Sequence, residues 1–182
     1  METKQLALMI DRLSVASLSN DLAVYMHEGE AARATKIHVV LERLDPGAYL
    51  IGTGPYTRGV FPLAKDEIVL GRMATPLEES SGIPLDIVVN DLTTLTPREV
   101  SRVHCAIFGK PSPDGYDYFL EDRGSTCGTF LNNKRLQALA ESDSSGVRFV
   151  HERLSDGDVI CLGPSFINTF VFARVGHTTD KL

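Results

Sequence analysis

Residues 124–132 read GSTCGTFLN, a glycine-rich turn that leads directly into a short apolar segment. Glycines in such a turn let backbone amides approach a ligand closely. Working outward along the chain, three other short motifs occur in order around it: Gly71-Arg72, Ser101-Arg102-Val103-His104, and LSDGDVICLG at residues 154–163. Each motif alone is weak evidence for a binding site, whereas the ordered set of four motifs is much stronger evidence.

Short apolar segments separated by Gly, Pro, Asn and Asp dominate the chain from residue 48 onward. Many short strands at this spacing are typical of an all-β sandwich or barrel. The pattern predicts strands at residues 49–52, 59–63, 67–70, 86–89, 104–108, 118–121, 129–131, 148–150, 159–162 and 168–175. Two polar stretches, 73–100 and 137–146, interrupt this pattern, and we predict that both are solvated loop insertions.

Residues 1–45 have a different pattern, which predicts a short helical extension. Apolar side chains recur at helical spacing in three stripes: Leu6, Met9, Ile10 and Leu13; then Leu18, Leu22, Tyr25 and Met26; then Ala34, Ile37, Leu41 and Leu44. The third stripe also fits a strand, because Ile37, Val39 and Leu41 alternate. Asp45-Pro46-Gly47 ends whichever element precedes it. We therefore divide the chain into a helical extension at 1–45, a β-sandwich at 46–176 and a C-terminal tail at 177–182.

The composition argues against several classes of protein. Of 182 residues, 43% are hydrophobic and 23% are charged, and the net charge is −6. Neither wholesale disorder nor the basic footprint of a duplex nucleic-acid binder is therefore indicated. No apolar stretch approaches the ~20 residues of a membrane span, and the N-terminus lacks the pattern of a secretory signal. Cys105, Cys127 and Cys161 form no CxxC pair, which argues against a disulfide framework or a zinc site. We expect a cytoplasmic protein that binds no metal, cofactor, nucleic acid or membrane.

The polar residues of the motifs suit the recognition of an anion. An arginine at a strand end offers a rigid fork of donors that matches phosphate, and a serine hydroxyl and backbone N–H groups add directional donors. Loops at one end of a sandwich would hold such groups on a rigid scaffold. The alternative for Arg72 is a surface ion pair, and the alternative for Ser101 and Thr126 is an ordinary role in turns.

These motifs, in this order, resemble the forkhead-associated (FHA) domain, a family of β-sandwiches that bind phosphothreonine peptides. The resemblance spans roughly residues 48–174. It implies a sandwich of about eleven strands with the peptide lying across loops at one end. By the same resemblance, Arg72 and Ser101 bind the phosphate, Arg102 supplies a second polar contact, and Thr126 lines the phosphothreonine pocket.

The resemblance also assigns structural roles. It implies that His104 braces the loops and that Gly71, Gly124 and Gly128 meet the requirements of turns. Cys127 departs from the family pattern, which usually places an asparagine there to hold the peptide backbone. A thiol is a weak donor and a weak acceptor, so we keep Cys127 among the peptide-binding residues and expect it to alter affinity and specificity.

The leading hypothesis is a phosphothreonine-dependent protein–protein interaction module that recruits a phosphorylated partner in kinase signalling. The alternative is a degenerate FHA domain that mediates phosphate-independent assembly, because Cys127 replaces the asparagine. Catalysis is not expected, since residues 124–128 depart from the G-x-S-x-G elbow of hydrolases, with Thr126 in the serine position. Residues 1–45 are in addition a candidate surface for self-association.

Overall fold

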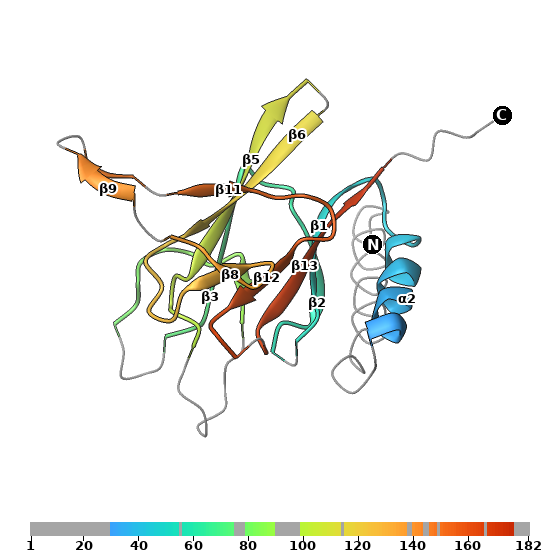
Figure 1. Ribbon diagram of the computed structural model, residues 1–182, viewed down its shortest axis with the longest axis horizontal. Helices are drawn as coiled ribbons and strands as arrows, with labels where there is room; N and C mark the ends of the chain where they lie inside the picture. Colours follow the sequence, from blue (N-terminus) through green and yellow to red (C-terminus); the bar gives the residue numbers. More distant parts are fainter. Residues whose placement is uncertain are drawn as a thin grey trace, which may run out of the picture.

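Two β-sheets packed face to face form the body of the protein in the computed structural model, with one helix against the outside of the first sheet (Figure 1). The structure describes residues 30–54, 56–74, 79–89, 99–113, 115–137, 140–143, 146–148, 150–165 and 167–176. Within these stretches, no helix has the length and apolar character needed to cross a bilayer.

The first sheet has six strands in the spatial order β2-β1-β13-β12-β7-β8, and all neighbours in it are antiparallel. Its strands are β1 Gly47–Gly52, β2 Gly59–Pro62, β7 Thr129–Leu131, β8 Lys134–Arg135, β12 Val159–Leu162 and β13 Thr169–Val175. Strand β1 pairs with β13 along the whole length of β1, from Gly47 opposite Val175 to Gly52 opposite Phe170. The two ends of the sandwich sequence therefore lie side by side in its centre.

The second sheet has five strands in the order β11-β6-β5-β3-β4. They are β3 Glu67–Gly71, β4 Ile87–Val88, β5 Cys105–Ser112, β6 Gly115–Asp122 and β11 His151–Arg153. Strands β3 and β4 are parallel, and the other neighbours are antiparallel. Six and five strands make eleven in the two sheets of the described chain, which confirms the predicted sandwich.

A two-stranded hairpin corrects one prediction. Residues 137–146 were expected to form a loop, but β9 Ala140–Asp143 pairs with β10 Gly146–Arg148, and the hairpin projects from the sandwich (Figure 1). The strand predicted at 148–150 is also misplaced, because β10 ends at Arg148 and β11 begins at His151. The two strands of this polar hairpin pair with each other and not with the two main sheets. Hydrophobic periodicity, which detects strands that face a core, therefore does not reveal them.

Inward-facing side chains of both sheets fill the space between them. Leu50, Phe170 and Phe172 of the first sheet meet Ile107 and Leu120 of the second, and none is more than 1% exposed. Full burial of each such side chain contributes roughly 1.5–3 kcal/mol. This core holds the strand ends in place and so provides the rigid scaffold on which the loops are mounted.

Helix α2, Glu30–Leu41, decides the ambiguous third stripe in favour of a helix. Its Val40 is 1% exposed and belongs to an apolar cluster with Ile51, Val60 and Ala173 on the outer side of the first sheet. The helix ends in a tight turn, where the amides of residues 43 and 44 bond to carbonyls three residues back. The first two predicted stripes, at residues 6–26, lie outside the described residues.

Candidate functional site

Arg72 and Ser101 meet at the end of β3. The amide of Arg72 donates to the carbonyl of Ser101 at 3.1 Å, so the two residues that were predicted to bind phosphate are adjacent. Gly71 permits this approach, because a Cβ on it would lie 2.1 Å from the Arg102 carbonyl oxygen. Gly71 was expected to serve a turn. The structure shows instead that the last residue of β3 must be glycine because another backbone packs against it.

His104 braces the loop that carries Ser101. It is fully buried, its Nδ1 accepts the amide of Ser101 at 3.0 Å, and its Nε2 lies 3.2 Å from the carbonyl of Gly128. A ring that accepts at Nδ1 carries its proton on Nε2, so the imidazole donates to Gly128. Burial lowers the pKa of His104, against the opposing influence of Asp122 and of the Gly128 hydrogen bond. This neutral imidazole ties the Ser101 loop to the Gly128 loop.

Thr126 reaches the same place from a third segment. Its amide donates to the Ser101 hydroxyl at 3.1 Å, and its side chain is exposed. The Ser101 oxygen accepts this bond with a lone pair, so its own O–H remains able to donate to a ligand. The main chains of Arg72 and Thr126 therefore both meet Ser101 at this end of the sandwich.

The turn at 122–129 is built around Asp122, a residue that the sequence reasoning missed. Its carboxylate accepts from the Ser125 amide at 2.8 Å, the Ser125 hydroxyl at 2.6 Å and the Thr129 hydroxyl at 2.6 Å. Burial acts to raise the pKa of Asp122, but the hydrogen bonds from Ser125 and Thr129 outweigh it and lower the pKa. Asp side chains often hydrogen-bond to nearby backbone groups in turns, and Asp122 three residues before Ser125 in a glycine-containing stretch was the available signal.

The Gly128 carbonyl joins three loops. It accepts from His104 Nε2 at 3.2 Å and from the amide of Gly163 at 3.0 Å. Gly124 and Gly128 have φ angles of +74° and +89°, a region that side chains other than glycine rarely adopt. Glycine at both positions therefore meets a turn requirement.

Arg102 and Cys127 complete the set of predicted peptide-binding residues. Arg102 is exposed, and its guanidinium donates to the main-chain carbonyl of Glu79, so it ties the Ser101 loop to the segment at 79–89. Cys127 lies between Thr126 and Gly128 and is half-buried, with a free thiol. The structure thus places Cys127 in the same loop as Thr126 and turns Arg102 toward a neighbouring loop.

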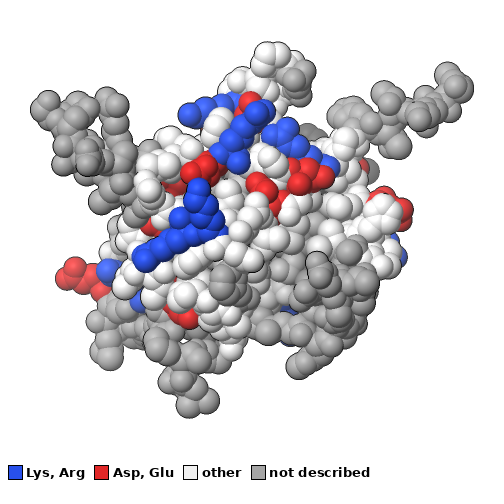
Figure 2. All heavy atoms as spheres, in the orientation of Figure 1, with Lys and Arg blue, Asp and Glu red and all other residues white. Residues whose placement is uncertain are grey.

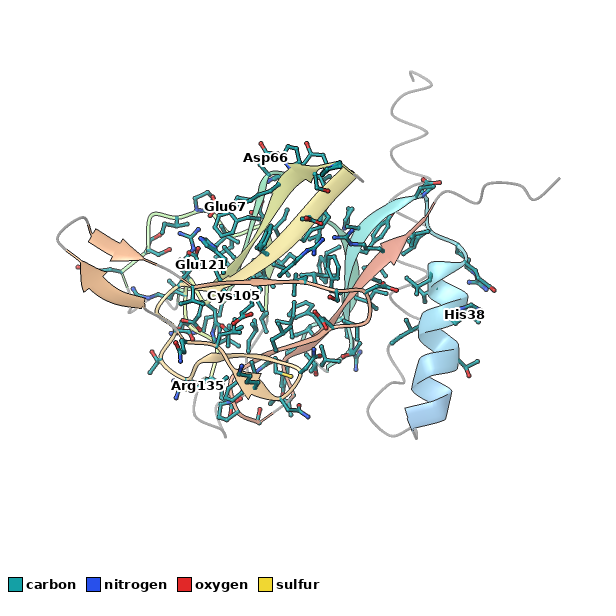
Figure 3. All side chains as sticks on the ribbon, turned by 45° about the horizontal axis from the view of Figure 1, so that its top comes forward. His38, Asp66, Glu67, Cys105, Glu121 and Arg135 are labelled. Atoms are coloured by element: carbon teal, nitrogen blue, oxygen red, sulfur yellow. The ribbon has the colours of Figure 1, made fainter. Side chains whose placement is uncertain are left out.

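Arg123 lies beside this site but has a structural role. Its Nε is 2.8 Å from a carboxylate oxygen of Glu121, and its Nη2 pairs with Glu67. The guanidinium also lies over the Phe108 ring, 5.1 Å from its centroid. Figure 3 shows Glu67 and Glu121 together on this side of the second sheet. These ion pairs join β6 to β3 across β5, which lies between them in the sheet.

The described residues contain no group of three or more His, Cys, Asp or Glu side chains arranged to hold a metal ion. Cys105 and Cys161 are buried free thiols, and burial raises the pKa of Cys161 to about 12. Neither thiol is poised to ionise at neutral pH.

Comparison with known proteins places this geometry in a family. No curated protein sequence matches the chain. The sequence model of the FHA domain matches residues 68–163, which is just over half of the 182 residues. That span contains Arg72, Ser101, His104 and the turn at 122–129.

The chain is similar to several solved structures at low sequence identity. Full-length yeast Pml1p is 19% identical, covering 81% of this chain and 98% of that chain with a TM-score of 0.51. The FHA domain of CT664 from Chlamydia trachomatis is 19% identical, covering 70% and 96%, with a TM-score of 0.47. The MEK1 FHA domain in complex with the HOP1 pThr318 peptide is 21% identical, covering 71% and 98%, with a TM-score of 0.46. From its matched sequence, and with an eleven-stranded sandwich that carries the motif residues on its loops, this chain belongs to the FHA domain family.

Proposed function

We propose that this chain is a phosphothreonine-dependent interaction module that recruits a phosphorylated protein. The observation that carries the proposal is the junction at Ser101, where the Arg72 amide meets the Ser101 carbonyl and the Thr126 amide meets the Ser101 hydroxyl. FHA domains are interaction modules, so the proposed activity is binding and involves no catalysis.

The chemistry of the junction suits a phosphate. A phosphothreonine carries a charge of about −1.5 to −2 at neutral pH and three strong acceptor oxygens. Arg72 supplies a cationic fork of donors next to the neutral donor of Ser101, and the exposed loop at Thr126 borders both. The buried side chains of His104 and Asp122 hold these loops by hydrogen bonds. The donors therefore need little reordering when a ligand binds, which favours affinity.

The proposal includes a place in the cell. A module of this kind would act downstream of a threonine kinase, in the cytoplasm, with the phosphorylated partner as its ligand. Membership of the FHA family and the absence of a secretory-signal pattern at the N-terminus of the sequence support this role.

A phosphate-independent FHA domain is the second candidate function, and Cys127 is the observation that favours it. A half-buried thiol cannot hold a peptide backbone as an amide would. In that case the same loops would serve assembly with a partner whether or not the partner is phosphorylated.

Titration of one peptide in its phosphothreonine, phosphoserine and unmodified forms separates these functions. We expect selective binding of the phosphothreonine form, and Arg72→Ala should weaken it by roughly 10- to 150-fold, the value of a lost charge-assisted hydrogen bond of ~1.5–3 kcal/mol. Ser101→Ala should cost less, because a neutral donor is weaker.

Arg153→Ala is the matched control. Arg153 is an exposed arginine paired with Asp117 at 2.8 Å. Asp117 lies five residues along β6 from Asp122, and at ~3.3 Å per residue this separation places the ion pair away from the turn that carries Thr126. This variant should bind like the parent. Equal binding by the Arg72→Ala protein would exclude the assigned phosphate site, and equal binding of the unmodified peptide would favour the phosphate-independent function.

A further inference from the structure

Arg135 of β8 lies directly against the binding loop. A Cβ built on Gly128 would come within 2.4 Å of Arg135 Nε, 3.0 Å of Cζ and 3.1 Å of Nη2. The guanidinium therefore lies close over the Gly128 backbone in this conformation. Strand β8 is the edge of the first sheet, and Figure 3 labels Arg135 there.

The hairpin that carries Arg135 is rigid. Strands β7 and β8 are joined by a two-residue turn in which Asn132 and Asn133 have φ angles of +49° and +66°, as in the tight type I′ hairpin turn. The Asn132 side chain donates to Asp158 at 2.8 Å and accepts the Val159 amide at 2.9 Å, which anchors the turn to β12. Arg135 is thus presented by a fixed element.

The charge of Arg135 faces solvent. The residue is exposed, and among the residues that the structure describes it has no carboxylate partner, whereas Arg123 and Arg153 have theirs. The backbone groups of Gly128 have other hydrogen-bond partners than the Arg135 guanidinium. The Gly128 N–H donates to the Ser125 hydroxyl, and the Gly128 carbonyl accepts from His104 and Gly163. Lys and Arg side chains gather over β8 on the face drawn in Figure 2.

The separation between this charge and the proposed phosphate site is short. Gly128 follows Thr126 by two residues, which a chain spans in at most about 7 Å, and Thr126 donates to Ser101. An extended peptide advances ~3.3 Å per residue. A side chain within about three residues of a phosphothreonine bound at Ser101 therefore comes within reach of Arg135.

We infer that Arg135 is a specificity-determining residue that binds an anionic group flanking the phosphothreonine, a carboxylate or a second phosphate. This inference rests on the proposed function and adds to it a preference among phosphopeptides. A guanidinium offers five donors in a planar fork that matches either group. Cys127 supplies only a weak donor, whereas Arg135 beside Gly128 supplies a charged one.

The test uses one phosphothreonine peptide with neutral flanks and variants that carry a single Asp or Asn at each position within three residues of the phosphothreonine. A phosphoserine variant at the preferred position distinguishes a second phosphate from a carboxylate. The parent chain, R135Q and R153Q are titrated with each peptide. We expect Asp at one position to tighten binding to the parent by roughly two- to fivefold over Asn, the range of an exposed ion pair.

R135Q should lose this preference while still binding the neutral phosphopeptide, and R153Q should keep it. R135E should reverse the preference toward a Lys-flanked peptide, a gain that a merely destabilised protein cannot produce. Persistence of the preference in R135Q, or its absence in the parent, overturns the inference and leaves the proposed function intact. If the parent binds the unmodified peptide as tightly as the phosphopeptide, the proposed function itself fails.

Discussion

The Asp122 carboxylate accepts three hydrogen bonds inside the turn that carries Thr126, and the side chain is 1% exposed. The Ser125 hydroxyl donates to Asp122 and accepts from the Gly128 amide at 3.0 Å, so one buried charge positions both ends of the loop. None of these atoms needs to touch a ligand. Residues that never reach the surface thus decide how the exposed donors are presented.

Asp122→Asn should therefore destabilise the fold. An amide NH2 cannot accept the hydroxyl hydrogen bonds that one carboxylate oxygen takes from Ser125 and Thr129, and a hydrogen bond to a charged group contributes ~1.5–3 kcal/mol. We expect the free energy of unfolding in urea to fall by at least that amount. Asp117→Asn, which removes the charge of a surface ion pair with Arg153, should change it by less than about 1 kcal/mol. Equal effects would show that the turn does not depend on Asp122.

Cys127→Asn should tighten phosphothreonine binding by a few-fold to about tenfold. The added amide can both donate to and accept from a peptide backbone, and a neutral hydrogen bond nets ~0.5–1.5 kcal/mol. The gain should appear as slower dissociation in surface plasmon resonance. Cys127→Ala is the control, because it removes the thiol and adds no donor. Unchanged or weaker binding by Cys127→Asn would mean that the loop grips the peptide elsewhere.

Among the secondary-structure elements, helix α2 covers the outer face of the first sheet. The outer faces of β1, β2 and β13 carry the apolar residues Ile51, Val60 and Ala173, and Val40 covers them. The helix face that holds Val40 is therefore occupied by the protein's own sheet. Self-association through residues 1–45 remains a proposal that would need other surfaces of this segment.

Neighbouring valines of α2 provide a matched test of this packing. Val40 is 1% exposed, whereas Val39 is 38% exposed. Val40→Ala removes two buried methyl groups and should lower the free energy of unfolding by roughly 1–3 kcal/mol. Val39→Ala should leave it within about 0.5 kcal/mol, since a surface substitution to alanine suits a helix. Urea denaturation measures both, and equal values would show that α2 does not pack on the sheet in solution.

At the scale of the whole molecule, buried ionisable groups make stability depend on pH in opposite directions. Burial lowers the pKa of His104, so below its ordinary value the unfolded chain binds a proton that the folded chain does not, and stability falls as pH falls. Burial raises the pKa of Glu121, more than Arg123 and His151 lower it. Above the ordinary value of Glu121 the folded chain therefore keeps a proton longer, and stability falls as pH rises through that window.

The contribution of His104 can be isolated by substitution. When the pH falls from 7.5 to 5.5, the free energy of unfolding of a protein with one buried neutral histidine falls by up to about 1.4 kcal/mol, because only the unfolded chain gains a proton at that residue. We expect His104→Gln to be less stable than the parent at pH 7.5 but to lose less stability on going to pH 5.5. Glu121 is present in both proteins, so the difference between their pH slopes reports His104. Identical slopes would mean that His104 accepts a proton in the folded state as readily as in the unfolded state.

Much of the architecture could be predicted from local pattern. Strands β7 and β12 occupy the predicted residues, because alternation and turn residues are local properties of the chain. Strands β5 and β6 run beyond the prediction, to Ser112 and from Gly115. Their polar outer halves pair with each other in a long hairpin that hydrophobic periodicity does not reveal.

The pattern of short apolar segments and turn residues predicts an all-β sandwich or barrel, and the order of the motifs is a property of the chain alone. The resemblance of these motifs to the FHA family implies the sandwich and the roles of Arg72, Ser101 and Thr126. Three contacts are visible only in the tertiary structure. The Arg102 carbonyl packs against Gly71, Arg123 forms ion pairs with Glu121 and Glu67, and Arg135 lies over Gly128. Such contacts depend on how strands align across a sheet and how loops cross at its end, and spacing along the chain does not encode those distances.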